Sequence, residues 1–323
     1  MAGYLRMLTW SGDRTRVPDA QLRDYFQDLA RRRDSTCFFD RFSSTTVVGA
    51  AGRLHVDHID VDETRPTLVF APGTNGYGLL YGEFLALLAD AGINVATFDP
   101  RGHGRSEGIR ASYTLDDVVD DLHAVARWAG RRARGPLFVG GSSQGGIAAF
   151  YLSSERHAPT WLAGAVCHNL ADLGHSDSAQ LTRWPRLSRL AGPALRALAR
   201  VLPEWPVPMS AYLDLEREPV RGFAHAAEVL RSDPLTVPFV RLKTLASLAY
   251  APLPQPVAAI TTPILVVQAD DDTIFATEYV RALLDRMTCD KRLLLYPGQS
   301  HYCIVDHAQA VAADVVAWLT REP

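Results

Sequence analysis

Long apolar runs and an excess of one charge are both absent from this sequence. No apolar stretch approaches the roughly 20 residues that a membrane-spanning helix needs. Residues 1–16 carry charges where a secretory signal peptide would be apolar. Basic and acidic residues nearly balance, 33 against 36, so no basic surface for a nucleic acid is indicated. We therefore expect a cytoplasmic protein with no transmembrane segment and no nucleic-acid partner.

Cysteine is also scarce, with four residues in 323. They are Cys37, Cys167, Cys289 and Cys303, and none of them belongs to a CxxC pair. This spacing argues against a disulfide framework and against a zinc cluster, so we expect free thiols. The composition, 47% apolar and 21% charged residues, excludes a disordered or fibrous chain and indicates a globular one.

Short apolar strands that alternate with helices dominate the sequence from residue 67 onward. Such alternation predicts a mostly parallel, doubly wound α/β sheet. The expected strands cover residues 67–70, 94–98, 137–139, 162–166, 264–268 and 292–296, after a hairpin at 45–48 and 53–61. The clearest helix signal is Thr114, which caps a helix with Asp117 three residues later. Further helices are expected at 147–152, 277–288 and 308–320.

The strand pattern stops between residues 171 and 256, where Arg, Leu, Ala and Pro dominate. We interpret 171–256 as a helical cap inserted between two parts of the core, residues 41–170 and 257–323. Within it, residues 187–202 are amphipathic, and their apolar stripe is expected to pack against the core or to face the substrate as a mobile lid. Residues 1–40 form an N-terminal extension with a surface helix at 21–33 and no recognisable chemical motif.

A serine flanked by glycines stands between an expected strand and an expected helix. Gly141 and Gly145 lie two positions before and after Ser143. A nucleophile elbow requires small residues there, because its sharp turn leaves no room for larger side chains. Centring the motif on Ser142 would place Gln144 at one of these small positions. We therefore predict Ser143 as a nucleophile.

A serine hydroxyl is a weak nucleophile that needs a base, and the base needs an acid to orient it. Asp270, Asp271 and Asp272 follow one expected strand, and His301 follows the next. Open α/β sheets assemble their sites at the carboxyl ends of their strands. The order Ser, Asp, His at successive strand ends predicts His301 as the base and one of the aspartates as the acid.

Two further loops complete a recognisable set of motifs. Pro72-Gly73-Thr74-Asn75-Gly76 follows the first core strand, and Asp99-Pro100-Arg101-Gly102-His103-Gly104-Arg105-Ser106 follows the next. With Ser143, Asp272 and His301, these loops resemble the α/β-hydrolase superfamily over residues 46–320. The resemblance is closest to its capped branch of monoacylglycerol lipases, lysophospholipases and serine aminopeptidases. Asp233-Pro234-Leu235, followed by Leu242-Lys243, also resembles that branch. This resemblance implies the α/β-hydrolase fold, a mostly parallel doubly wound sheet with an inserted helical cap.

The resemblance also implies which aspartate is the acid. Strands of this family usually end in Gly, two residues and then Asp. Ala269 takes the glycine position here, which indicates Asp272 and leaves Asp271 as the alternative.

The resemblance further implies where an oxyanion would be stabilised. The expected donors are the backbone N–H groups of Gln144 and Thr74. Pro72 replaces the histidine of the family's His-Gly pair, a side chain that commonly braces this loop. The side chain of Asn75 is therefore an alternative donor to Thr74.

These motifs predict a serine hydrolase that cleaves a carboxylic ester of a small or medium, largely apolar substrate through an acyl-enzyme. No metal and no organic cofactor is expected. A thioester, a lactone, an amide or a carbon–carbon bond beside a ketone is the alternative substrate, because fold does not fix substrate. A catalytically silent relative that binds a small ligand is the alternative from another class. Epoxide hydrolases and dehalogenases are disfavoured, because those relatives carry aspartate where Ser143 stands.

The remaining polar motifs have simpler interpretations. His103 lies in a turn that we expect to be a rigid loop, with Asp99 accepting its backbone hydrogen bonds. His58, Asp60 and Asp62 share one strand face and could mimic metal ligands, but an exposed polar edge is the expected role. The candidate wall residues of a substrate pocket are Trp184, Trp205, Met209, Tyr212, Phe223, Phe239 and Tyr250.

Overall fold

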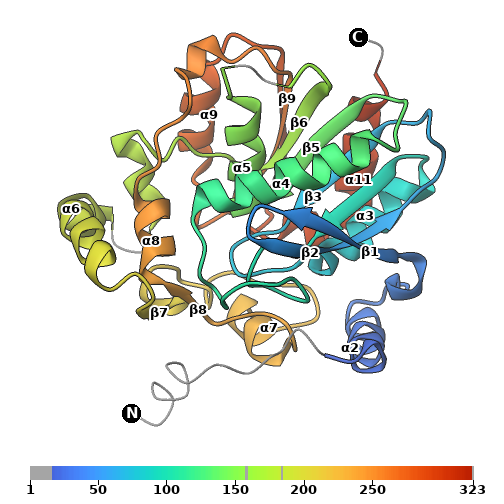
Figure 1. Ribbon diagram of the computed structural model, residues 1–323, viewed down its shortest axis with the longest axis horizontal. Coiled ribbons are helices and arrows are strands. Elements are labelled where there is room, and N and C mark those ends of the chain that lie inside the picture. The colour runs from blue at the N-terminus through green and yellow to red at the C-terminus, as the bar shows by residue number, and fades with distance from the viewer. Residues whose placement is uncertain (1–16, 157–158, 183–184, 322–323) are drawn as a thin grey trace.

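An eight-stranded sheet forms the centre of the computed structural model, which describes residues 17–156, 159–182 and 185–321 (Figure 1). Its strands are β1 (Ser43–Gly49), β2 (Gly52–Ile59), β3 (Thr67–Ala71), β4 (Asn94–Phe98), β5 (Leu137–Ser142), β6 (Leu162–His168), β9 (Ile264–Ala269) and β10 (Lys291–Tyr296). Their order across the sheet is β1-β2-β4-β3-β5-β6-β9-β10. Only the pairs β1–β2 and β2–β4 are antiparallel; the other pairs of this sheet are parallel. The predicted mostly parallel α/β sheet is therefore confirmed.

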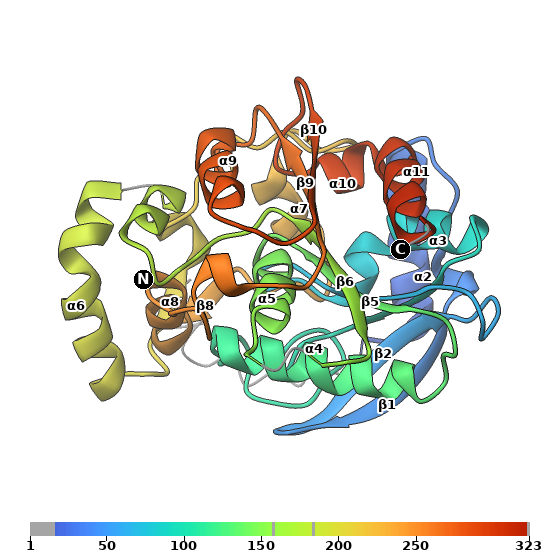
Figure 2. The ribbon, with the colours of Figure 1, turned by 90° about the horizontal axis from the view of Figure 1, so that it is seen from above.

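Helices cover both faces of the sheet, which is why β3, β4 and β5 are buried along their whole length and consist mainly of apolar and small residues. On one face lie α4 (Leu115–Gly130), α5 (Gln144–Ser153) and α9 (Thr277–Asp285). On the other lie α3 (Gly82–Asp90), α10 (Cys303–Asp306) and α11 (Ala308–Leu319). Figures 1 and 2 show these two layers on either side of the strands. The sequence analysis does not predict α3.

The start of α4 shows how a local signal fixes an element. Thr114 Oγ1 accepts a hydrogen bond from the backbone N–H of Asp117 at 3.2 Å. The Asp117 carboxylate accepts the backbone N–H of Thr114 at 2.8 Å. This reciprocal capping box satisfies two N–H groups that a helix start leaves unpaired, as the sequence predicts.

The chain between β6 and β9, which we call the β6–β9 segment (residues 169–263), contains short helices and a small sheet. Its helices are α6 (Pro185–Val201), α7 (Ala226–Ser232) and α8 (Leu242–Ala249). Its two strands, β7 (Pro206–Pro208) and β8 (Phe239–Arg241), pair antiparallel and are not anticipated by the sequence analysis. Figure 2 shows α6 at the end of the molecule opposite α11.

The apolar stripe of α6 does not pack against the core sheet. Leu195 and Ala199 pack with Leu242 and Ala246 of α8. By contrast, Leu190 is 82% exposed. Leu195 and Ala199 thus pack within the β6–β9 segment and do not show the expected packing against the core, which is one of the two roles predicted for the stripe.

The N-terminal helix α2 (Asp19–Arg32) is anchored by aromatic and aliphatic side chains. Leu22, Phe26 and Leu29 are buried in a cluster with Tyr77 from the loop after β3 and Leu235 from the β6–β9 segment. The helix predicted at the surface thus joins the core to the β6–β9 segment.

Two global expectations can be compared with the structure. All four cysteines are free, as their spacing predicts. None of the described helices is both long enough and apolar enough to cross a membrane.

The strand order reverses between β3 and β5, because β4 lies on one side of β3 and β5 on the other. In open α/β sheets, ligands bind in the crevice at the carboxyl ends of the strands beside such a switch point. The loops that follow β3 and β5 therefore define where a site is expected.

Candidate active site

Ser143 lies at the sharp turn between β5 and α5, with φ 55° and ψ −119°. This left-handed backbone conformation is strained for a residue with a side chain and is typical of functional positions. The turn is held in part by the Ser143 N–H, which donates to the backbone oxygen of His168 at 2.8 Å.

The glycines around Ser143 are required by close backbone contacts. A Cβ atom on Gly141 would lie 2.2 Å from the carbonyl carbon of Gly145, and one on Gly145 would lie 2.1 Å from the oxygen of Ala71. No side chain fits at such distances. The sequence pattern around Ser143 is thus explained by the packing of β3, β5 and α5.

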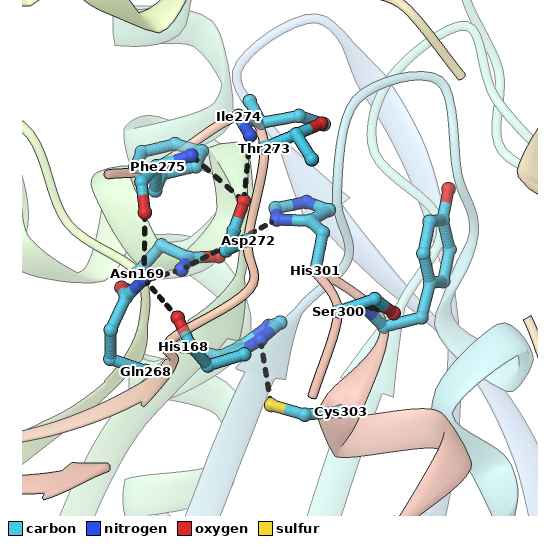
Figure 3. Close-up of polar contacts among 12 residues, drawn as sticks. His168, Asn169, Gln268, Asp272, Thr273, Ile274, Phe275, Ser300, His301 and Cys303 are labelled. Atoms are coloured by element: carbon cyan, nitrogen blue, oxygen red, sulfur yellow. Dashed lines mark hydrogen bonds and ion pairs between the residues drawn. The ribbon is translucent and has the colours of Figure 1, made fainter. Parts of the chain in front are cut away.

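Asp272 follows β9 and is buried, and both oxygens of its carboxylate accept hydrogen bonds (Figure 3). One oxygen accepts the backbone N–H groups of Ile274 and Phe275, both at 2.8 Å. The other accepts His301 Nδ1 at 2.8 Å and Asn169 Nδ2 at 3.0 Å. Burial alone would raise the pKa of Asp272, but the His301 charge and these hydrogen bonds hold it below the ordinary value.

The two neighbouring aspartates point elsewhere. Asp271 is exposed, and its backbone N–H donates to the oxygen of Gln299 at 3.0 Å. Asp270 is exposed and accepts the N–H of Gly298 at 2.5 Å. Of the three aspartates, Asp272 is the one in contact with His301.

His301 is buried between aromatic rings at the carboxyl end of β10. Phe275 stacks on its ring with a centroid distance of 5.7 Å and an interplanar angle of 5°. Because the carboxylate of Asp272 only accepts hydrogen bonds, Nδ1 donates and the lone pair of the neutral ring lies on Nε2. Burial alone would lower the pKa of His301, but the charge and hydrogen bond of Asp272, with a further contribution from Glu218, raise it overall.

Ser143 and His301 line the same cavity of about 90 Å³, together with Thr74 and Tyr81. The hydrogen bonds of the described residues do not include one between the Ser143 hydroxyl and the His301 ring. The structure therefore joins His301 to Asp272 directly and places Ser143 and His301 on one cavity wall.

Glu218 of the β6–β9 segment is a site residue that sequence reasoning missed. It is fully buried, and one carboxylate oxygen accepts the backbone N–H of His301 at 3.0 Å. The other accepts both the backbone N–H, at 3.1 Å, and the hydroxyl of Thr273, the residue after Asp272. The Glu218 side chain thus connects the loops that carry Asp272 and His301 to the β6–β9 segment. No sequence signal marks it, because its partners lie more than fifty residues away along the chain.

The carboxyl end of β6 contributes two more residues that the sequence analysis missed. Asn169, with φ 64°, donates to Asp272 and, at 2.9 Å, to Gln268. His168 contacts the hydroxyl of Ser142 at 2.7 Å and lies beside the His301 ring. Burial lowers the pKa of His168 to about 3, so this ring is neutral and does not repel a protonated His301. The sequence signal that could have identified His168 and Asn169 was their position at the carboxyl end of a predicted strand.

Both expected oxyanion donors lie beside Ser143. Thr74, Ser143 and Gln144 line a larger cavity of about 280 Å³. Gln144 is the first residue of α5, and the first N–H groups of a helix have no partner within it. An anion at this position would also face the positive end of the helix dipole.

The side chain of Asn75 is not available as an oxyanion donor, which corrects the alternative kept from the sequence. Its amide donates to the backbone oxygens of Val237 at 2.8 Å and Phe239 at 2.5 Å. Its oxygen lies 3.2 Å from His103 Nε2 and accepts the Tyr113 hydroxyl at 3.3 Å. Asn75 therefore braces the loop of Thr74.

Tyr113 joins the two expected donors. Its hydroxyl donates to the side-chain oxygen of Gln144 at 2.9 Å as well as contacting Asn75. His103 contacts the same network through the side chain of Asn75. Burial lowers the pKa of His103 to about 4, which keeps the ring neutral. This buried network therefore connects the loop of Thr74 to Gln144.

The loop after β4 has the structural role predicted for it. Asp99 accepts the backbone N–H groups of Arg105 at 2.7 Å and Gly78 at 3.0 Å. His103 is held by Asn75 and by the backbone oxygen of Arg101, and it lines neither cavity beside Ser143.

The polar residues of β2 do not gather into a metal site. No cluster of metal-ligating side chains occurs within the described residues. His58 contacts Asp60 at 3.2 Å, while Asp57 is buried and paired with Arg105 at 2.7 Å. Asp60 and Asp62 follow β2 and are exposed, as expected, but β2 itself lies between β1 and β4 and is not an edge strand.

The candidate wall residues divide into three groups. Tyr212 lines the larger cavity and Met209 the smaller one. The other described candidates, Trp205, Phe223, Phe239 and Tyr250, line neither cavity. Trp184 lies outside the described residues.

A nucleophile turn after a central parallel strand, beside the switch point of a sheet with this strand order, defines an α/β-hydrolase. Within that class, the chain belongs to the family described as serine aminopeptidase, S33, whose sequence profile matches residues 62–308. This confirms the resemblance drawn from the sequence motifs.

Comparisons with individual proteins agree with this assignment. A monoacylglycerol lipase of Mycolicibacterium smegmatis is 28% identical over 267 residues, which cover 80% of this chain and 89% of that protein. The crystal structure of the Paleococcus ferrophilus monoacylglycerol lipase gives a TM-score of 0.65 at 19% identity, covering 86% of this chain and 98% of that one. A soluble variant of the Saccharomyces cerevisiae monoglyceride lipase with a substrate analogue gives 0.70 at 18% identity, covering 87% and 96%. The structural similarities show a shared fold.

Proposed function

We propose that this α/β-hydrolase is a serine esterase that cleaves a carboxylic ester of a small or medium, largely apolar substrate. The observation that carries the proposal is the cavity at the switch point, which Ser143 and His301 both line, with His301 hydrogen-bonded to Asp272 behind it. The similarity to proteins named monoacylglycerol lipase supports an ester as the substrate.

In the proposed cycle, His301 Nε2 takes the proton of Ser143 as the hydroxyl oxygen attacks the ester carbonyl. The backbone N–H groups of Gln144 and Thr74 stabilise the oxyanion that forms. Collapse of this intermediate breaks the bond to the alcohol, which receives its proton from His301. Water then attacks the acyl carbon and gives a proton to the same ring, which passes it to Ser143 Oγ as the acyl–enzyme bond breaks and the acid is released. Asp272 keeps the ring in the required tautomer and stabilises its charged form.

The two cavities beside Ser143 suggest how the substrate lies. His301 must protonate the leaving alcohol, and His301 lines the smaller cavity but not the larger one. We therefore assign the alcohol to the smaller cavity. The acyl group extends into the larger one, whose walls include Ile147, Leu173 and Leu245. Its volume of about 280 Å³ is near the low end of ligand pockets, as a short or medium acyl chain requires.

We also propose that residues 171–256 act as the cap of this site. Leu181, Leu195 and Tyr212 from this stretch line the larger cavity. Met209 and Leu230 line the smaller one. The stretch thus supplies wall residues on both sides of Ser143, while residues 41–170 and 257–323 supply the reacting groups.

An ester panel tests the proposal. We expect turnover of 4-nitrophenyl esters with a maximum at short or medium acyl length, and a loss of about 10⁴-fold or more in Ser143→Ala. The matched control is Ser153→Ala, which removes another buried serine hydroxyl at the far end of α5. Faster cleavage of the matched thioester, amide or lactone would replace the ester by that class. No turnover of any of these would indicate a silent ligand-binding relative.

The cytoplasmic location is likewise a proposal. The free cysteines fit a reducing compartment, where disulfides are rare. Fractionation of cells that express the protein at its natural level would test it, with recovery outside the cytoplasm as the contradicting result.

A further inference from the structure

The smaller cavity contains one charged side chain besides His301. Its lining residues are mainly apolar, for example Tyr81, Val220 and Ile304, and they include no carboxylate. The additional charge is the guanidinium of Arg33, which follows α2 in the N-terminal extension.

Arg33 is buried but incompletely paired. It is 6% exposed, and its Nε donates to the backbone oxygen of Arg221 at 3.3 Å. Its two Nη atoms make no hydrogen bond or ion pair with the part of the chain that the structure describes. By contrast, Arg32 pairs with Asp28 at 2.7 Å. Guanidinium N–H groups that no described residue pairs with are available to a ligand that brings acceptors.

The carboxylates nearest to Arg33 lie outside the smaller cavity. Burial lowers the pKa of Arg33, and the charges of Asp306 and Glu83 oppose this effect. Glu83 is already paired with Arg221 at 2.8 Å, and Asp306 accepts the Arg221 backbone N–H at 3.0 Å. Both acids line a separate surface pocket with Arg221. They offset the charge of Arg33 without filling its hydrogen-bonding positions inside the cavity.

We propose that Arg33 binds an anionic oxygen group, a phosphate monoester or a carboxylate, on the alcohol portion of the ester substrate. The inference rests on the proposed function, because it uses the assignment of the alcohol to the cavity that His301 lines. A planar guanidinium with free N–H groups matches such an anion, and the apolar surroundings strengthen the interaction. The chemistry that Arg33 recognises is common to both anions.

The N-terminal extension thereby becomes part of substrate recognition. Arg33 lies outside residues 62–308, where the family profile matches, so the family match alone does not imply this specificity. The side chain is held in place because Phe26 and Leu29 fix α2 against Tyr77.

Three octanoyl esters test the proposal, because they share the acyl group and differ in the alcohol. The alcohols are glycerol, glycerol 3-phosphate and glycolate. We expect the wild-type protein to show a higher kcat/KM for the phosphate or carboxylate ester than for the glycerol ester. In Arg33→Gln this preference falls by about 10- to 150-fold, mainly through KM, as expected for loss of a charged hydrogen bond. The kcat/KM of the glycerol ester falls less than that of the two charged esters.

Two variants control for charge and for folding. Arg33→Lys keeps the charge but loses the planar fork, so it retains part of the preference. Arg31→Gln removes a charge at the same end of α2 from a side chain that is 76% exposed, and it leaves the preference unchanged. Thermal unfolding of each variant identifies those that are folded at the assay temperature.

Binding of glycerol 3-phosphate, measured by calorimetry, separates this inference from the proposed esterase function. Binding that Arg33→Gln weakens by about 10-fold or more supports the Arg33 site even where no ester is cleaved. A wild-type preference for the glycerol ester overturns the proposal. So does an equal loss on all three esters in folded Arg33→Gln, or binding of glycerol 3-phosphate that this variant does not change.

Discussion

At position 272, a buried carboxylate is maintained because four hydrogen-bond donors surround it. They are two backbone N–H groups, Asn169 and His301. A charge without these donors would be costly at this depth. The same contacts fix the orientation of the His301 ring, so in the proposed cycle Asp272 is a positioning residue that acts through His301.

Replacing Asp272 by Asn should lower kcat by about 10⁴-fold, because the amide no longer selects the tautomer that leaves Nε2 free. Asp271→Asn is the matched control, since that side chain is exposed beside the site. Its kcat should stay within a few-fold of the wild type. Steady-state kinetics on a 4-nitrophenyl ester measures both. A larger loss in Asp271→Asn than in Asp272→Asn would reverse the assignment.

Glu218 should affect the pH profile more than the maximal rate. The raised pKa of His301 means that its ring loses a proton only above its ordinary value of 6.5, so kcat/KM should rise with pH through a midpoint above 6.5. Glu218→Gln removes a negative charge that favours the protonated ring. The midpoint should therefore move to lower pH.

A pH series of kcat/KM on wild type and Glu218→Gln checks this expectation. A purely structural role for Glu218 would lower kcat at every pH and leave the midpoint in place. That result would contradict the electrostatic role.

At the scale of elements, Tyr113 connects the two chain segments that contain the expected oxyanion donors, Thr74 and Gln144. The Tyr113 hydroxyl contacts the side chain of Asn75, which follows Thr74 in the chain. It also contacts the side chain of Gln144. Gln144 is fixed where β5 turns into α5, whereas Thr74 lies in the loop after β3. The relative position of the two N–H groups therefore depends on this buried network.

Tyr113→Phe should lower kcat with little change in KM, by less than the roughly 10²-fold that loss of a whole oxyanion donor costs. It should also lower the free energy of unfolding by about 1–3 kcal/mol, because the oxygen of Gln144 loses its donor. Tyr279→Phe is the matched control. It removes a buried phenol hydroxyl that accepts the Asp172 N–H at 3.0 Å, away from both donors. Equal loss of kcat in the two variants would contradict the positioning role.

Features that depend on neighbouring residues could be predicted from the sequence, whereas features that depend on contacts between distant residues could not. Strand periodicity and the Thr114 capping box are local signals, and both appear in the structure as expected. Three-residue strands such as β7 and β8 are too short for any period. The role of Asn75 depends on acceptors 162 and 164 residues away. Ser143 has a local motif, whereas Glu218 is identified only by its neighbours in the fold.

At the scale of the whole molecule, α2 connects the core to the β6–β9 segment. Phe26 is 1% exposed and contacts the rings of Phe38, Phe39 and Tyr77. The described part of the extension, residues 17–40, is therefore packed as part of the folded unit, although it lies outside the family match.

Phe26→Ala should lower the free energy of unfolding by about 3–5 kcal/mol, as expected for a large cavity in a buried cluster. Urea denaturation measures this change. Leu190→Ala removes an exposed side chain from α6 and should change it by less than about 0.5 kcal/mol. An equally small effect of Phe26→Ala would show that α2 is not part of the cooperative unit.

The central claim is that three side chains distant in sequence act as one catalytic group around Ser143. The most direct measurement is the site and rate of labelling by a fluorophosphonate, determined by mass spectrometry on active protein. The account predicts a single adduct on Ser143, formed much more slowly in His301→Ala and Asp272→Asn. Active protein that is labelled on another residue, or that labels at the wild-type rate without His301, would contradict it.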